Sequence, residues 1–107
     1  MSKILTSPVK EFPGTVEFPD YLTLPQFAEY SDMSLSVKGK SAFTHALVMW
    51  PVQKKLLTGE WKIENLPKER DFSVEPFKPV YPLLSFMGWL HKEFMKLVSD
   101  ANDIPNA

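Results

Sequence analysis

The architecture of this chain follows first from one amphipathic segment, residues 82–101, which reads PLLSFMGWLHKEFMKLVSDA. Pro82 suits the first turn of a helix, because a missing backbone N–H costs nothing there. Its main apolar stripe has spacings of four and three, typical of one helix face, and consists of Leu83, Met87, Leu90, Phe94 and Leu97. Further apolar side chains lie beside this stripe, so we expect a long helix that the rest of the chain, or another subunit, covers on more than one side.

A second helix is predicted over residues 42–50, an apolar run that follows Ser41. A serine in this position can cap the free backbone N–H groups at the start of a helix. The polar residues 34–40 form the connector that precedes it. Helical spacing assigns the buried stripe of this helix to Phe43, Ala46, Leu47 and Trp50.

Pro51 directly follows this run. Proline lacks a backbone donor and disfavours the helical conformation of the residue before it, so we expect a kink or a break here. Residues 52–58 should continue for a turn or two, with Leu56 and Leu57 facing inward. Gly59 would suit a left-handed helix terminator.

A shorter helix is expected to begin after Thr23. Threonine can cap a helix, and Pro25 is tolerated in its first turn. Several serines follow, and their hydroxyls compete for backbone hydrogen bonds. We therefore expect this helix to end near Met33.

Extended structure is predicted at the N-terminus, over residues 1–20. Pro13 and Gly14 suit the two central positions of a type II turn. The turn would join the β-prone runs 9–12 and 15–18 into a small hairpin or a pair of extended arms.

Residues 60–81 show little periodicity and contain three prolines, so we expect a long loop with a short extended piece around residues 61–63. Loops of this length are uncommon in compact domains, and aromatic residues should anchor this one: Trp61, Phe72 and Phe77. Residues 1–107 therefore indicate a single, mostly α domain. It has three main helices, a small extended or hairpin N-terminal element, and a long Pro-containing loop before the last helix, which packs across the second.

The composition disfavours several classes of function. The 107 residues include no cysteine, which removes disulfides, thiolate zinc sites and thiol nucleophiles. A formal net charge of −1 and scattered lysines disfavour binding to nucleic acid. We see neither a secretory signal nor an apolar stretch long enough to cross a membrane, so we expect a cytoplasmic protein with no membrane partner.

No catalytic, cofactor or metal site is predicted. Residues 39–41 resemble the end of a phosphate-binding loop, but Ser34 stands where that motif needs a glycine. His45 and His91 each lack a second metal ligand nearby in the sequence. A small enzyme stays an alternative, and it would need a pocket that gathers both histidines with an acidic residue.

Binding to a protein is the favoured class of function. Aromatic and methionine side chains are enriched in interface cores, and this chain has three Trp and five Met. Core packing is the ordinary use of such residues, but some of them could contact a protein partner or a second copy of the chain. The candidate contacts are Trp50, Trp89 and Met95.

Five short motifs also occur in a particular order: LTSPVK at 5–10, PGTV at 13–16, LTLPQ at 22–26, WKIENLP at 61–67 and IPNA at 104–107. This order resembles a group of small tail-module proteins of long-tailed bacteriophages. The resemblance implies a tail assembly chaperone in the host cytoplasm, which holds the tape-measure protein soluble while the tail tube grows around it. The tail tube protein is the other partner that it suggests. The alternative is a structural virion or adaptor component that remains in the particle and reaches a neighbour with its extended N-terminus.

Overall fold

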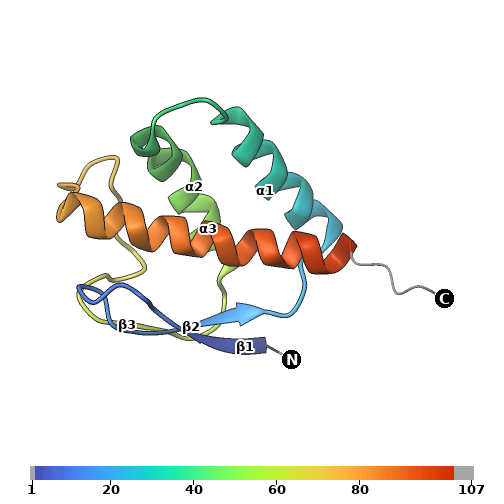
Figure 1. Ribbon diagram of the computed structural model, residues 1–107, viewed down its shortest axis with the longest axis horizontal. Coiled ribbons are helices and arrows are strands. Elements are labelled where there is room, and N and C mark those ends of the chain that lie inside the picture. The colour runs from blue at the N-terminus through green and yellow to red at the C-terminus, as the bar shows by residue number, and fades with distance from the viewer. Residues whose placement is uncertain (1, 103–107) are drawn as a thin grey trace.

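The structure is a computed structural model, and it describes residues 2–102, with side chains as far as residue 99. Figure 1 shows the last helix crossing the molecule, with the strands on one side of it and the two other helices on the other side. The prediction of a mostly α fold with three main helices and a small N-terminal element is confirmed. In chain order the elements are β1 (Ser2–Thr6), β2 (Gly14–Pro19), α1 (Leu24–Ser36), α2 (Ala42–Leu56), β3 (Trp61–Ile63) and α3 (Val80–Asn102).

The three strands form one antiparallel sheet in the order β1-β2-β3. β2 lies in the middle, and its alternate residues Val16 and Phe18 are fully buried beneath the helices. The extended piece expected at residues 61–63 is confirmed as β3, which pairs with the start of β2.

The N-terminal hairpin exists, but its predicted bounds are wrong. The partner of β2 is β1, further upstream than residues 9–12, which lie in the connecting loop. Gly14 is the first residue of β2 and not part of a type II turn. It has φ 131°, and a Cβ placed there would lie 1.8 Å from the carbonyl oxygen of Lys62. The glycine is therefore needed for the close approach of β2 to β3.

α1 begins directly after Thr23, as expected, and the backbone N–H of Thr23 donates to Oε1 of Gln26 at 2.8 Å. The helix ends at Ser36 and so runs almost one turn past the predicted end near Met33. The hydroxyl of Ser36 donates to the carbonyl oxygen of Met33 at 2.7 Å. The side chain of Ser36 thus bonds within the last turn and does not terminate the helix earlier.

The sequence predicts a kink or a break at Pro51, and α2 runs from Ala42 to Leu56 with this proline inside it, so a break is ruled out. The predicted stripe is also wrong in part, because Phe43 and Leu47 are more than half exposed. Gly59 lies beyond the end of the helix and does not have the predicted left-handed conformation. The inward side of α2 consists instead of Ala46, Met49, Trp50, Val52, Gln53 and Leu56.

α3 carries the stripe that the sequence predicts, and all five of its residues are buried. The helix packs on α2, as expected. The long loop before it is anchored by its aromatic residues, which are partly buried against the core. The ring centroids of Trp61 and Phe86 lie 5.7 Å apart, and those of Phe72 and Trp50 lie 6.1 Å apart. These contacts confirm the predicted role of the loop aromatics.

Candidate functional site

A small polar cluster joins the three helices within the helical half. Tyr30 of α1 and Gln53 of α2 are each only 1% exposed, and His91 of α3 is half-buried. The hydroxyl of Tyr30 lies 2.8 Å from Nδ1 of His91. Nε2 of Gln53 donates to the Tyr30 hydroxyl and to the carbonyl oxygen of Met87, each at 3.5 Å. Because the Tyr30 oxygen accepts from Gln53, its own proton is free to be donated to His91.

Burial keeps this cluster uncharged near neutral pH. It raises the pKa of Tyr30 to about 12, against a smaller opposing effect of the Gln53 hydrogen bond. It also lowers the pKa of His91, and the nearby His45 lowers that pKa further when it is protonated. The cluster is therefore a set of neutral donors and acceptors.

One acceptor in the cluster has no partner. Oε1 of Gln53 is buried, and no donor within the described part of the chain reaches it. The orientation of the amide follows from its other end, because Nε2 faces the Met87 carbonyl oxygen and a flipped amide would place two oxygens together. A buried amide oxygen without a donor is rare and calls for an explanation.

A cleft of about 370 Å³ opens beside this amide, between α2 and α3, and we call it the α2–α3 cleft. Both histidines line it, so the structure brings together His45 and His91, which the sequence places far apart. No acidic side chain lines the cleft, and the described residues contain no group of three or more His, Asp or Glu that could hold a metal ion. The cleft thus lacks the acidic residue that an acid–base site with these histidines would need. Besides the histidines, the residues that line it include Ala46, Met49, Gln53, Leu84 and Met87.

A second depression of about 410 Å³ lies between α1 and the C-terminal half of α3, and we call it the α1–α3 groove. Leu24, Leu35 and Met95 line it and are 80%, 64% and 42% exposed. No charged residue lines this groove. Tyr30 lines the groove and bonds to His91, which lines the cleft, so this pair lies between the two depressions.

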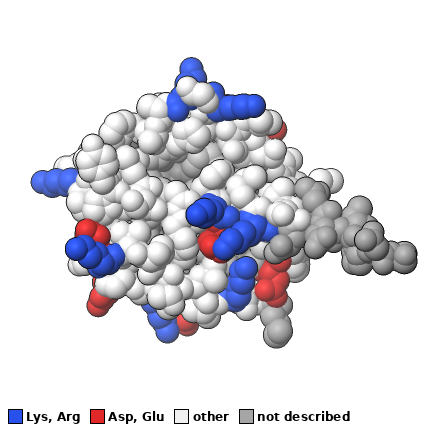
Figure 2. All heavy atoms as spheres, in the orientation of Figure 1, with Lys and Arg blue, Asp and Glu red and all other residues white. Residues whose placement is uncertain are grey.

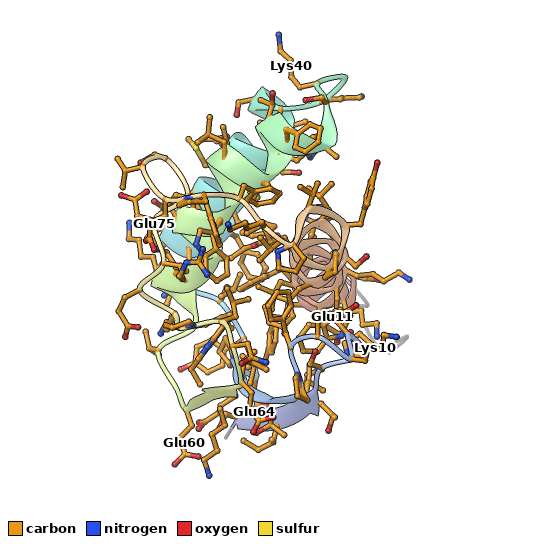
Figure 3. All side chains as sticks on the ribbon, turned by 90° about the vertical axis from the view of Figure 1, so that its left-hand side faces the viewer. Lys10, Glu11, Lys40, Glu60, Glu64 and Glu75 are labelled. Carbon is orange, nitrogen blue, oxygen red and sulfur yellow. The ribbon has the colours of Figure 1, made fainter. Side chains whose placement is uncertain are left out.

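Within residues 2–99, no charged side chain lines the α1–α3 groove, and Lys40 is the one lysine or carboxylate among the residues that line the α2–α3 cleft. Figure 2 shows a hollowed, largely uncharged area on the helical half of the visible face, with lysines and carboxylates at its borders. In Figure 3 the side chain of Lys40 points away from the molecule at the connector between α1 and α2. Glu60 and Glu64 lie at the opposite end, by the sheet. The recognition chemistry of this face is therefore apolar, with a few neutral polar groups.

The three predicted contact residues differ in how far they are exposed to a partner. Trp50 lies in the core at 2% exposure, and its indole N–H donates to the carbonyl oxygen of Arg70 at 2.8 Å, so it presents no surface to a partner. Trp89 is half-buried and packs on Phe18 and Phe86, toward the sheet. Met95 lines the α1–α3 groove and is exposed, as a contact residue must be.

Sequence reasoning missed the residues that surround Met95 and the polar cluster. Leu35 lies beyond the predicted end of the first helix, and Gln53 lies beyond the kink or break predicted at Pro51. The signal that could have found Leu35 is its spacing of four and eight residues from Ser31 and Phe27 on one helix face. No local signal relates Tyr30, Gln53 and His91, because each comes from a different helix.

Comparison with known proteins finds no match to this chain among protein-family models, curated proteins or solved structures. Within residues 2–102, none of the helices combines the length and the apolar character needed to cross a membrane.

Proposed function

We propose that this domain is a non-catalytic protein-binding module that shields an apolar segment of a client protein, as a bacteriophage tail assembly chaperone does. The observation that carries the proposal is the α1–α3 groove with its exposed side chains Leu24, Leu35 and Met95. Exposed apolar patches on soluble domains commonly mark interaction sites. Covering this groove removes apolar surface from water, which is the main favourable term in protein association.

The walls of the groove favour an apolar client segment. Two helices flank the groove, as in proteins that bind an amphipathic helix in a groove. Its lining has no charge, and its polar groups are hydroxyls, among them those of Ser31 and Ser34. Burial of apolar side chains would supply the affinity, so we expect binding to depend only weakly on salt.

The link to phage tails rests on the resemblance of the motifs. The motif at residues 22–26 forms the start of α1 and supplies Leu24 to the groove. The motif at residues 61–67 contains β3, and the motif at 104–107 lies outside the described residues. On this reading the client is the tape-measure protein, whose apolar segments need cover before the tail tube encloses them, and the tail tube protein is the second partner to test.

The test is co-expression with a tape-measure protein, the client that this proposal names. The variant Leu35→Gln with Met95→Gln alters two exposed groove residues, so the fold should be retained. We expect the unmodified chain to keep the client in the soluble fraction and to co-purify with it, and the double variant to lose at least about ten-fold in affinity. Val74→Gln is the matched control, because Val74 is 81% exposed and lies outside the groove. Equal co-purification of all three proteins, or none with the unmodified chain, would overturn the proposal.

A second candidate is a structural component that stays in the virion. It is favoured by β1, which lies at the edge of the sheet with Ile4 56% exposed and could pair with a strand of a neighbour. The two candidates differ in whether the protein is present in the finished particle. A mass-spectrometric inventory of purified particles should lack a chaperone and should contain a structural component in fixed copy number.

A further inference from the structure

We infer that β1 is a dimerisation edge, at which two copies of this chain pair antiparallel about a two-fold axis at Ile4. Their sheets then form one continuous sheet. The inference goes beyond client binding, because it names a second copy of the chain as the partner of the sheet edge. The observation that carries it is the hydrogen-bonding pattern of β1, whose free backbone groups match those of a second copy.

The first step concerns the direction of the backbone groups. In an antiparallel pair, opposite residues alternate between those that exchange both hydrogen bonds and those whose backbone groups point away from each other. The N–H of Ser7 donates to the carbonyl oxygen of Gly14 at 2.9 Å, so these two residues are a bonded pair. By the same register Lys3 and Leu5 also bond to β2. The backbone groups that point away from β2 are therefore those of Ser2, Ile4 and Thr6.

The other side of β2 supports this pattern. The N–H of Glu17 donates to the carbonyl oxygen of Glu60 at 2.9 Å, toward the β3 side. Glu17 lies opposite Ile4 in the register, so its backbone groups point away from Ile4. Within residues 2–102, β2 is the one strand that pairs with β1, and β1 lies at the lower border of the molecule in Figure 1. The outer edge of β1 is therefore open.

The second step concerns the register with a second copy. An axis at Ile4 places the two Ile4 residues opposite each other and places Ser2 opposite Thr6 of the second copy. All the outward groups then form hydrogen bonds. An axis at Lys3 would leave Thr6 without a partner and would place two lysines directly opposite each other, which is unfavourable. An axis at Leu5 would leave Ser2 facing Pro8, which has no N–H.

The third step concerns the side chains. Ile4 is 56% exposed, and the axis brings the two Ile4 side chains together, so each removes apolar surface of the other from water. Edge strands are commonly kept from pairing by a proline or by charge on the exposed face. The exposed side chains of β1 are neutral, and the strand contains no proline. They are those of Ser2, Ile4 and Thr6.

The fourth step concerns what the dimer leaves free. A two-fold axis occupies the β1 edge of both copies, so the assembly closes at two. α1 lies on the other side of α3 from the strands (Figure 1), so the α1–α3 groove of each copy stays open. Two grooves on one dimer would bind two segments of one client, and the second binding step would then be intramolecular. An edge of five residues is short, so we expect a weak dimer, with a dissociation constant on the order of 100 μM.

The test measures association of the full chain by sedimentation equilibrium between about 10 and 1,000 μM. We expect the unmodified chain to dimerise in this range. Ile4→Lys and Ile4→Glu each place like charges opposite each other at the axis, so each should weaken the dimer at least about ten-fold. An equimolar mixture of the two variants should restore association, because opposite charges then meet. Val74→Lys is the matched control and should dimerise like the unmodified chain, since Val74 is 81% exposed and lies outside the strands.

A second measurement locates the axis. The chain has no cysteine, so a single introduced thiol reports on one position. Ile4→Cys should form an intermolecular disulfide under mild oxidation, because the Cα atoms of a bonded antiparallel pair lie about 5.5 Å apart, within the range of disulfides. Thr6→Cys is the matched control, because the two Thr6 residues lie at opposite ends of the paired strands. It should form the disulfide at least about ten-fold more slowly.

Circular dichroism of every variant checks that the fold is retained. A monomeric unmodified chain at the highest concentration, no recovery of association in the mixture, or equal disulfide formation by Ile4→Cys and Thr6→Cys would overturn the inference. Failure of the inference differs from failure of the proposed function. Client capture by a monomer contradicts only the dimer, and a dimer that captures no client contradicts only the proposed function.

Discussion

Tyr30 is the residue on which the helical half of the molecule converges. Its ring stacks on Phe94 at 4.7 Å and on the imidazole of His91 at 5.8 Å, and its hydroxyl takes part in the polar cluster. A phenol in this position buries a large apolar ring and satisfies its one polar group internally. The same burial makes its ionised form unfavourable.

This burial predicts a loss of stability in alkali. The pKa of Tyr30 rises from 10.0 to about 12 on folding, so the folded state favours the neutral phenol. Its contribution is complete below pH 10 and is lost as the pH rises from about 10 to 12, by about 2 to 3 kcal/mol in the free energy of unfolding. Urea unfolding of the unmodified chain and of Tyr30→Phe at pH 8, 10 and 11.5 measures the difference between them. A difference that stays constant with pH would contradict the buried, neutral phenol.

Two glycines form a matched pair for a second prediction. Gly14→Ala should lower the free energy of unfolding by about 3 kcal/mol or more, because φ 131° and contact with the Lys62 carbonyl oxygen both oppose a side chain. Gly88→Ala should raise it by about 0.5 to 1 kcal/mol, because it lies in a helix with open space beside it. Chemical unfolding of both variants checks the opposite signs. A mild effect of Gly14→Ala would show that β2 and β3 can move apart.

At the scale of elements, α2 shows how packing overrides a local preference. Pro51 is exposed, whereas its neighbours Trp50, Val52 and Gln53 are buried. Continuing the helix through the proline keeps all three neighbours in the core, and this burial outweighs the lost backbone hydrogen bond. The sequence shows the cost of the proline but not the partners that offset it, which is why a kink or a break was predicted.

The cost of Pro51 can be measured. Pro51→Ala supplies the missing backbone donor within α2 and removes the clash of the ring with the preceding turn. We expect the free energy of unfolding to rise by about 1 to 3 kcal/mol, less the small contribution that proline makes by stiffening the unfolded chain. Pro8→Ala, in the exposed loop after β1, should give no such gain. Thermal unfolding followed by circular dichroism compares the two variants, and a lower melting temperature of Pro51→Ala would contradict this account.

Whether each of the other elements could be predicted depends on how far apart in the sequence the contacting residues lie. The stripe of α3 and the cap of α1 were predictable, because spacing along one helix and the Thr23 cap are local features. The first strand was misplaced because β1 is selected by its pairing with β2, in which Leu5 lies opposite Val16. Strand pairing is a contact between distant residues, and a short alternating run does not specify its partner.

At the scale of the whole molecule, the candidate site could be predicted only in part. Met95 was found because exposed methionines often mark interaction surfaces, and it lines the groove. The polar cluster could not be found, since the crossing of three helices brings Tyr30, Gln53 and His91 together. The same crossing explains why Trp50, a plausible contact in the sequence, is used for packing on Trp61 and Phe72.

The sheet and the helices share one core, and Phe86 links them. This residue of α3 is fully buried, and its ring contacts Phe12 before β2 at 5.9 Å, Trp61 of β3 at 5.7 Å and Trp89 at 5.5 Å. Phe86 therefore couples the sheet side to α3, which itself packs on α2. We therefore expect the domain to unfold in a single cooperative step.

Phe86→Ala tests this coupling. The substitution should lower the free energy of unfolding by about 3 to 5 kcal/mol, because it removes a fully buried ring and leaves a cavity. Tryptophan fluorescence, which includes Trp61 in the sheet, and far-ultraviolet circular dichroism of the helices should still change at the same denaturant concentration. Val74→Ala, at a residue that is 81% exposed, should leave the midpoint almost unchanged. If fluorescence changed at a lower denaturant concentration than the helical signal, the sheet would unfold separately, and the shared core would not hold the two sides together.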